Sequence, residues 1–488
     1  MTLTVYNTLT RRQEPFKTVE PGLVKMYCCG VTVYDYCHLG HARSYIVWDV
    51  LRRYLQWRGY QVRYIQNFTD IDDKILNRAH EQGSTMEAVS NRFIDAYFED
   101  IRRLNVMDAD FYPRATEHIP EIESLIKNLE DQDLAYAAGG DVYYRVHSFH
   151  TYGKLSGRNL EQMQAGASGR VDVEDPESQK KQYPLDFALW KAAKPGEPSW
   201  DSPWGKGRPG WHIECSAMIR TQFGETIDIH GGGGDLVFPH HENEIAQSEG
   251  ATHKPLANYW MHNGMVVVDG KKMSKSLGNF ITIRELLDGK WAKYPQPIDP
   301  MAIRLFVLQA HYRKPLDFTE EAIVGAVNNW KTLQEGLLFG EQFGEKLGFT
   351  DNDNQVDKTL IQRFEEFGDD DLNFSGSLAV LFELAKKLIR EGNILVHQGK
   401  IETPTAELQT AWNTLVTLAH VLGLKAKLEV DETSSTGLSD ADIDKLIKQR
   451  TEARSNKNFA ESDRIRNELQ AQGVTLIDTK VGTTWHRS

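Results

Sequence analysis

Two short motifs, far apart in the chain, constrain its fold more than any other feature. The first, His38-Leu39-Gly40-His41, lies between residues 23–33, which combine Val, Tyr, Met and Cys, and a helical apolar pattern that begins at Arg43. This order predicts a buried strand that passes directly into a helix, with both histidines on one side of the helix's first turn. Unpaired N–H groups and the helix dipole favour phosphate there, and Gly40, without a Cβ, lets a flat adenine lie against its backbone.

The second motif, Lys272-Met273-Ser274-Lys275-Ser276, places two ammonium groups on a short mobile loop after a predicted strand at residues 265–268. Each motif alone has another explanation. The first is compatible with a capped helix that carries surface histidines, and the second with a solvated basic turn. Together they predict a site for ATP, because dipoles and cations would meet on its phosphates.

The pair resembles the signature motifs of the class I aminoacyl-tRNA synthetases, with Leu39 where isoleucine is usual. The resemblance implies an α/β fold: a Rossmann-type catalytic domain with an inserted connective region, then an α-helical bundle and a small C-terminal module. It also implies that His38, His41, Lys272 and Lys275 are the catalytic residues, which stabilise the triphosphate while the α-phosphate is attacked. Gly40, His38, His41 and Lys275 would bind ATP.

Cysteine, histidine and glutamate residues point to a metal site. The chain of 488 residues has 4 cysteines, at positions 28, 29, 37 and 215, which are too few for a disulfide scaffold of this size. Cys215 lies in a predicted helix that begins after a Pro-Gly pair. His240 and Glu244 are four residues apart, so a helix would place them on one face, with His241 and Glu242 pointing away.

Zinc takes Cys sulfur, His nitrogen and carboxylate oxygen, and Cys29, Cys215, His240 and Glu244 would form such a set. Spacing alone leaves the alternative open, because free cysteines are often core residues and His/Glu pairs are often surface contacts. Segments 27–35, 211–218 and 228–244 resemble the zinc-bearing segments of the cysteine-specific members of the family. This resemblance implies one Zn²⁺ per chain, held by these four residues.

The same resemblance implies L-cysteine as the substrate, with Trp211 and His230 lining its side-chain pocket. Neighbours in a strand face opposite sides of the sheet, so only one cysteine of the doublet can reach the metal. The resemblance implies that this is Cys29, which precedes Gly30 as the ligand does in the family motif, while Cys28 and Cys37 pack in the core. Zinc binds thiolate better than hydroxyl, whereas pocket shape separates such similar substrates by only about 1–3 kcal/mol. No editing domain is therefore expected, and the polar insertion at residues 165–181 is too short to hold one.

The acidic run at residues 69–74, Thr-Asp-Ile-Asp-Asp-Lys, has the composition of a magnesium site, but we interpret it as the start of a helix capped by Thr69 or Asp70, without a metal. His262 is equally compatible with a contact to the nucleotide and with a structural role.

The predicted domains are a catalytic domain over residues 1–297 with its insertion at roughly 110–200, a tRNA-binding helical bundle over 298–429, and a linker with a small anticodon-binding module over 430–488. A helical pattern begins at residues 299–311, and amphipathic segments follow at residues 318–340, 357–367, 375–396 and 405–422. Within them, Leu378, Leu381, Leu384 and Leu388 form one apolar stripe that should be bundle core. Residues 369–371, all aspartate, should cap or precede a helix, and 430–439 should be a linker.

The net charge of −13 is unfavourable for binding nucleic acid, but residues 441–488 carry nine Lys or Arg and seven Asp or Glu, a net of +2. Arg450 and Arg454 would share one helix face that follows a tRNA backbone, and Trp485 would offer a ring to an unstacked base. The alternative is a solvated face, with the tryptophan anchoring the tail.

These observations predict an enzyme that activates L-cysteine with ATP and Mg²⁺ and transfers it to tRNA(Cys). Two alternatives remain: a ligase that joins the adenylate to a sugar amine, and a non-enzymatic zinc and RNA-binding protein. The first fifteen residues do not resemble a signal peptide, and no apolar run is long enough to span a bilayer. We therefore expect a cytoplasmic monomer.

Overall fold

The computed structural model describes residues 2–160, 179–350, 354–427 and 440–487, apart from positions 457, 473, 480 and 481. The predicted linker at residues 430–439, and all but the last three residues of the insertion at 165–181, lie outside the described residues. The chain divides into two compact units, one formed by residues 1–333, 356–383 and 413–425, the other by 334–355, 384–412 and 426–488. The predicted division after residues 297 and 429 stays a prediction.

A parallel four-stranded sheet in the order β10-β9-β3-β4 forms the centre of the first unit. Its strands are β3 (Leu23–Cys28), β4 (Gln61–Gln66), β9 (Ile227–Gly233) and β10 (Ala257–Asn263). The helix α1 (Leu39–Trp57) joins β3 to β4, and α6 (Glu242–Thr252) joins β9 to β10. The chain between β4 and β9 holds the insertion, so the expected split Rossmann-type sheet is present, and its carboxyl ends face a crevice where such folds bind ligands.

The helix α1 begins four residues earlier than the apolar pattern alone indicates, because His38 caps it. Its apolar residues Ile46, Val47, Val50 and Leu51 are all buried, as predicted. The strand before it is shorter than expected and ends at Cys28, so Cys29 lies just outside regular strand geometry.

Between β4 and the insertion the chain forms α2 (Asp73–Glu81) and α3 (Met86–Arg103), and the insertion then begins with a short turn at Ala115–Glu117 and α4 (Ile119–Asp131). Asp72 caps α2 by accepting from Lys74 N, so the prediction of Thr69 or Asp70 as the cap is wrong. Asp70 instead binds the backbone and hydroxyl of Thr116, because the chain reaches regular helix only at Asp73.

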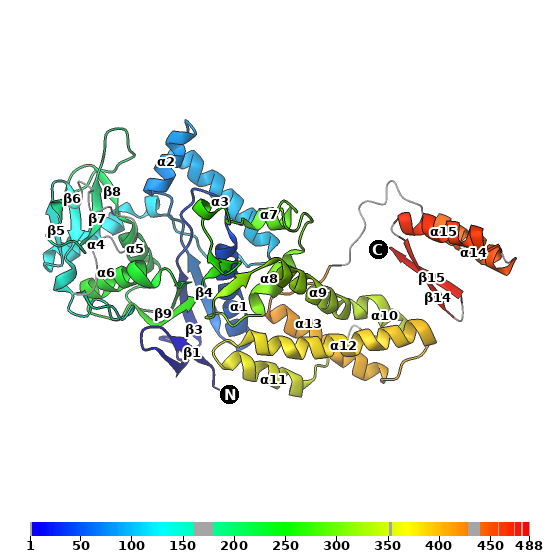
Figure 1. Ribbon diagram of the computed structural model, residues 1–488. Helices are drawn as coiled ribbons and strands as arrows, with labels where there is room; N and C mark the ends of the chain where they lie inside the picture. The colour runs from blue at the N-terminus through cyan, green and yellow to red at the C-terminus, as the bar shows by residue number, and fades with distance from the viewer. Residues whose placement is uncertain are drawn as a thin grey trace. The chain divides into compact units, whose positions relative to one another are not determined.

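An antiparallel sheet in the order β5-β6-β7-β8 completes the insertion, with strands β5 (Ala135–Ala138), β6 (Asp141–Tyr144), β7 (Phe187–Ala192) and β8 (Gly207–Pro209) and a turn at Val146–Ser148. Its core residues, among them Ile122, Leu125 and Trp190, pack against Ile213 of α5 (Trp211–Phe223) and Ala246 of α6. Figure 1 shows α5 and α6 beside this sheet. The insertion therefore supports the two helices that carry predicted metal ligands.

The remaining elements of the catalytic region are small. The hairpin β1 (Thr4–Asn7) and β2 (Arg12–Pro15) lies at the N-terminus, and a three-stranded sheet contains β11 (Val266–Val268), β12 (Lys271–Lys272) and β13 (Leu316–Phe318). Short turns at Val237–His241 and Lys275–Leu277 precede α6 and α7 (Ile283–Leu287), and α8 (Pro300–Leu308) follows, capped by Asp299.

The predicted amphipathic segments are helices: α9 (Glu320–Leu337), α11 (Lys358–Asp369), α12 (Phe374–Gln398) and α13 (Thr405–Val421), together with α10 (Phe339–Leu347). The stripe Leu378, Leu381, Leu384 and Leu388 is buried, as expected. The aspartate triplet ends α11 and precedes α12, as expected. Among the described residues, no helix combines the length and hydropathy needed to cross a membrane.

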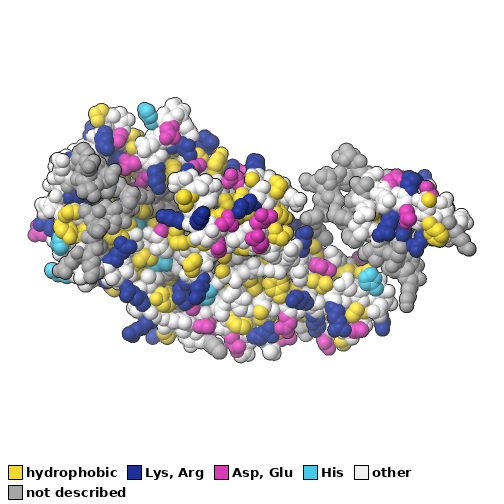
Figure 2. Space-filling view, viewed as in Figure 1, with side chains coloured by type: hydrophobic (Ala, Val, Ile, Leu, Met, Phe, Trp, Pro, Cys, Tyr) yellow, Lys and Arg dark blue, Asp and Glu magenta, His cyan; other side chains and the backbone are white. Residues whose placement is uncertain are grey.

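A small C-terminal module contains α14 (Asp440–Ser455), α15 (Phe459–Ala471) and the antiparallel pair β14 (Val474–Thr479) and β15 (Gly482–Arg487). Ile443, Ile447, Ile465, Leu469 and Val474 form its core. On the face of the chain shown in Figure 2, basic and acidic side chains are interspersed among the residues described.

Candidate metal centre and nucleotide cleft

A cavity of about 300 Å³ lies at the carboxyl ends of the parallel strands and joins the two predicted sites. Cys29, Cys215, His240 and Trp211 line one part of its wall, and His38, Gly40 and His41 line another. The tertiary structure thus brings the sulfur-bearing residues and the first signature motif into a single cleft.

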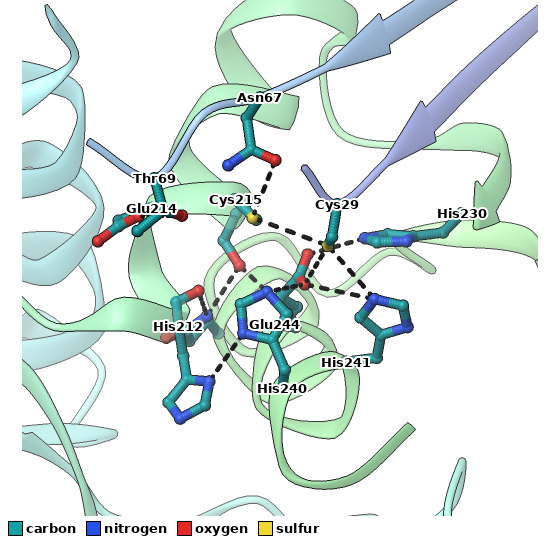
Figure 3. Close-up of polar contacts among 12 residues, drawn as sticks. Cys29, Asn67, Thr69, His212, Glu214, Cys215, His230, His240, His241 and Glu244 are labelled. Atoms are coloured by element: carbon teal, nitrogen blue, oxygen red, sulfur yellow. Dashed lines mark hydrogen bonds and ion pairs between the residues drawn. The ribbon is translucent and has the colours of Figure 1, made fainter. Parts of the chain in front are cut away.

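The four predicted metal ligands come from four elements and meet at one point (Figure 3). Cys29 follows β3, Cys215 lies in α5, His240 in the turn before α6, and Glu244 in the first turn of α6. Each side chain is buried, and the four donor atoms lie within 4.8 Å of one another. His240 Nε2 is 3.0 Å from Glu244 Oε1, which confirms the predicted shared face. The donor set fits zinc, which binds these atom types.

The cysteine doublet divides as predicted. Cys29 Sγ lies 3.8 Å from Cys215 Sγ and 3.4 Å from Glu244 Oε1. Cys28 packs instead against Gly231 of the neighbouring strand β9. A Cβ placed on this glycine would lie only 2.7 Å from the Cys28 sulfur. Cys37 is also buried, with 3% of its surface exposed.

The prediction that His241 points away is wrong. Its Nε2 lies 3.3 Å from Cys29 Sγ, and its Nδ1 lies 2.8 Å from His262 Nε2. His241 and Glu244 are three residues apart, a spacing that an α-helix also places on one side, and His241 Nε2 lies 4.0 Å from Glu244 Oε1. Glu242 does point away from the cluster, because its carboxylate accepts from the backbone of Gly153 and Ser156.

A second donor set therefore overlaps the first: Cys29, His230, His241 and Glu244 also lie within 4.8 Å of one another. The two sets differ in their relation to the cleft. Cys29, Cys215 and His240 line the cavity, whereas His230 and His241 are fully buried and are not among its lining residues. A metal on the first set would face the substrate side.

His230 was predicted to line the cleft, but it is not among the lining residues. Its Nε2 lies 2.8 Å from Glu244 Oε2, and its ring stacks on Trp260 with centroids 4.5 Å apart, so it supports Glu244 from behind. Trp211 does line the cleft and stacks on His240, with centroids 4.2 Å apart. His262 binds His241 and Thr8, which favours the structural role over a nucleotide contact.

The cluster is electrostatically prepared for a cation. A hydrogen bond from Cys29 lowers the pKa of the Cys215 thiol to about 6 despite its burial. Burial lowers the pKa of His240, but the carboxylate of Glu244 and the Cys215 thiol outweigh it and raise the pKa to about 9. Burial raises the pKa of Glu244, but His230 and His240 outweigh it and hold it well below its usual value. At neutral pH these pKa shifts leave Cys215 and Glu244 negatively charged beside a protonated His240, so the cluster contains anionic donors that suit a metal cation.

Sequence reasoning missed Asn67, which follows β4 and lines the cleft. Its side-chain oxygen accepts from Gly30 N at 2.9 Å and lies 3.8 Å from Cys215 Sγ. A Cβ on Gly30 would lie 1.6 Å from the Asn67 carbonyl oxygen, so only glycine fits there. An amide at the carboxyl end of a strand in the parallel sheet was the available signal.

In the first motif, the two histidines close the N-terminus of α1. His38 Nδ1 accepts from Gly40 N and His41 N at 3.0 and 3.4 Å, His41 Nδ1 accepts from His38 N at 3.2 Å, and the rings stack at 3.7 Å. Since each Nδ1 accepts, each Nε2 carries the proton and can donate. A Cβ on Gly40 would lie 2.8 Å from His38 Cε1, so the capping ring itself requires glycine.

Both imidazoles are held neutral. Burial, and then Lys275, lowers the pKa of His38 to about 4. Burial, and then His38, lowers the pKa of His41 well below its usual value. At neutral pH each imidazole is therefore uncharged and can act as a hydrogen-bond donor.

The lysines of the second motif lie at the edge of the cleft. Lys272 ends β12 and is exposed, whereas Lys275 forms an ion pair with Asp35, which lines the cavity. Lys275 Nζ also lies 5.1 Å from the ring centroid of Phe280, another lining residue.

The predicted tRNA contacts in the C-terminal module need correction. Arg450 is 5% exposed and donates to Thr483 Oγ1 at 3.2 Å, so it supports the module internally. Trp485 packs on the module core and donates to Asp444 at 2.9 Å, which agrees with the alternative that it anchors the tail. Only Arg454 of the three is exposed, because one face of α14 packs on β15.

Family models match three consecutive parts of the chain. Residues 15–328 match the class I (C) tRNA synthetase catalytic domain, 363–427 the DALR domain, and 436–485 the cysteinyl-tRNA ligase anticodon-binding domain. Cysteine–tRNA ligases from Trichormus variabilis and Rippkaea orientalis are 75% and 65% identical to this chain, and each comparison covers 100% of both proteins.

Solved structures share the fold at low identity. Mycobacterium tuberculosis methionyl-tRNA synthetase with methionyl-adenylate has a TM-score of 0.55 at 16% identity, covering 82% of this chain and 89% of that one. Agrobacterium radiobacter LeuRS in a ternary complex with tRNA and LeuAMS has a TM-score of 0.60 at 11% identity, covering 84% and 85%. With relatives of high identity along its whole length and a matching catalytic domain, the chain belongs to the cysteine–tRNA ligases of the class I aminoacyl-tRNA synthetase family.

Proposed function

We propose that the chain activates L-cysteine with ATP, forming cysteinyl-adenylate and pyrophosphate, and then transfers the cysteinyl group to the terminal ribose of tRNA(Cys). The observation that carries this proposal is the single cleft whose wall contains both Cys29, Cys215 and His240 and the first signature motif. One end suits a thiol and the other a triphosphate, as this reaction requires.

Cys29, Cys215, His240 and Glu244 would hold one zinc ion. Their four buried donor atoms within 4.8 Å support this set, as does the position of three of them on the cleft wall. Bound zinc would supply a ligand position that the substrate thiolate fills far better than the hydroxyl of serine. Trp211, stacked on His240, would close the side-chain pocket, and His230 would orient Glu244.

No side-chain nucleophile is needed at the other end, because the cysteine carboxylate attacks the α-phosphate itself. His38 and His41 would donate from Nε2 to the phosphates, and Lys275, with Lys272, would balance the charge that moves onto the leaving pyrophosphate. Gly40 keeps the His38 ring in its capping position. Mg²⁺ would accompany ATP. The protein contributes alignment and preorganised donors.

The match of residues 436–485 to an anticodon-binding domain supports tRNA as the acceptor and gives no support to a sugar amine. Arg454, exposed on α14, is the predicted contact that still suits a tRNA backbone. We also propose that the enzyme is a cytoplasmic monomer, which light scattering on the purified protein would test for its oligomeric state.

Two assays test the proposal. ATP–pyrophosphate exchange should depend on cysteine and should not proceed with serine at the same concentration, which serves as the matched control. Labelled cysteine should then become attached to tRNA(Cys). Exchange without tRNA charging, but with transfer to an amino sugar, would identify the alternative ligase, and absence of exchange in zinc-loaded protein would leave only a binding function.

A further inference from the structure

We infer that Asp35 is a positioning residue for Lys275 and that Arg78 makes this role compatible with a triphosphate; the inference rests on the proposed function. Asp35 lies in the loop between β3 and α1, three residues before His38, and its carboxylate lines the cleft. It contacts Lys275 Nζ, so it joins the two signature motifs directly.

The ammonium group of Lys275 is held at the cleft wall by more than this ion pair. Its Nζ lies 5.3 Å from the ring centroid of Tyr34 and 5.1 Å from that of Phe280, at distances where a cation is attracted to an aromatic ring. Tyr34, Asp35 and Phe280 all line the cavity that contains His38 and His41. The exposed lysine of a short turn is thereby placed at the edge of the phosphate end before any ligand arrives.

Such placement matters because a long lysine side chain loses much of its rotamer freedom when it is ordered. Asp35 orders Lys275 in advance, so less of this freedom remains to be lost at the transition state. An ammonium group has three N–H donors, and one can stay on Asp35 while the others meet phosphate oxygens. Asp35 therefore need not release the lysine.

A carboxylate at the wall of a triphosphate site would ordinarily repel the ligand. Arg78 of α2 removes this objection, since its guanidinium lies 2.9 Å from Asp35 Oδ2. Two cations thus share one carboxylate, so Asp35 is not an unpaired negative charge at the cleft wall. The backbone N–H of Tyr36 also donates to Asp35 Oδ1 at 2.9 Å, which fixes the orientation of the carboxylate.

The test is a double-mutant cycle with Asp35→Asn and Lys275→Ala. Asparagine keeps the oxygen that accepts from Tyr36 N and removes the charge that holds the lysine. We expect Asp35→Asn to lower kcat/KM for ATP by about tenfold in the exchange assay, with the KM for cysteine and the zinc content unchanged. In the Lys275→Ala background the same substitution should cost less than about twofold, because there is no lysine left to position.

Two further variants separate positioning from damage to the fold. Asp35→Glu, which keeps the charge, should recover part of the loss. Asp131→Asn removes an exposed aspartate that pairs with Lys127 at 2.8 Å on α4 and should leave kcat/KM unchanged. The inference is overturned if Asp35→Asn has no effect, increases activity, or costs as much with Lys275 absent as with it present.

Failure of the proposed function can be distinguished from failure of the inference about Asp35. If the wild-type protein showed no cysteine-dependent exchange, ATP affinity measured by calorimetry would still decide the role of Asp35. Asp35→Asn should weaken ATP binding only in protein that retains Lys275, and equal weakening in both backgrounds would overturn the inference.

Discussion

The two ends of the cleft are built in opposite ways. At the sulfur end, Cys29, Cys215, His240 and Glu244 are buried and contact one another before a ligand is present. At the phosphate end, Lys272 and Lys275 are exposed and are carried by a two-residue strand and a short turn. We infer that the first end selects the substrate through a fixed set of buried donors, whereas the second acts on reaction rate through exposed side chains, of which Lys275 is held in advance by Asp35.

The largest effect is expected from removing a ligand at the sulfur end. Cys215→Ser should reduce zinc affinity by more than about 100-fold, since even supporting residues of metal sites cost 10–100-fold. Zinc measured in the purified protein should fall from one equivalent toward none, and cysteine-dependent exchange should fall with it. Cys37→Ser, at a buried cysteine outside the cluster, is the matched control and should keep the metal.

The same measurement on His241→Ala distinguishes the two overlapping donor sets. If His241→Ala loses the metal and Cys215→Ser keeps it, the ion occupies the second donor set, which contains His230 and His241. The inference that the metal faces the cleft and that these histidines only support it would then be wrong.

At the phosphate end, we expect a loss of rate without a loss of metal. Lys275→Ala should lower kcat for pyrophosphate exchange by about 10²-fold, the usual cost of removing one preorganised group that stabilises transition-state charge. Zinc content should stay at one equivalent. Lys272→Ala should lower kcat less, because none of the contacts described for Lys272 is with a residue of the cleft wall. A larger effect for Lys272 would reverse the assignment within the motif.

His38 makes a smaller contribution, visible in the dependence of stability on pH. Its pKa is about 4 in the folded chain and about 6.5 when unfolded, so between these values the unfolded chain binds a proton that the folded chain does not. Stability should therefore fall as pH drops from 6.5 to 4, by about 1–2 kcal/mol at pH 5 from this residue. His38→Asn keeps the helix cap but does not titrate. Urea unfolding at pH 7 and 5 should show a smaller pH effect in this variant than in wild type.

The smallest effect should come from a residue outside the cleft. Arg454→Ala should raise the KM for tRNA by a few-fold, with pyrophosphate exchange unchanged. The slope of tRNA affinity against salt concentration should fall by the amount expected for about one phosphate contact. Arg450→Ala provides a contrast, because removal of this buried arginine should lower the stability of the C-terminal module instead. A change in pyrophosphate exchange for Arg454→Ala would mean that the module influences activation as well as tRNA binding.

Sequence reasoning identified helices and motifs well where regular periodicity applied. The helix after the Pro-Gly pair and the contact of His240 with Glu244 follow from local rules that tertiary contacts did not override. The cap at His38 was not predicted, because the apolar pattern begins only at Arg43. Sequence reasoning also failed where the position of a side chain depends on a distant segment: His241 contacts Cys29, Arg450 contacts Thr483, and Trp485 contacts Asp444.

Local sequence was enough to specify the chemical groups of this protein: two imidazoles at a helix start, two lysines close together in a short motif, and a limited supply of sulfur and carboxylate ligands. Their periodicity and capping are properties of a few adjacent residues, so they can be derived without the fold. Which groups share a cleft, which face of it they occupy, and that Asp35 joins the two motifs are set by packing between segments hundreds of residues apart. Those contacts arise from the burial of whole elements, and no local rule contains them.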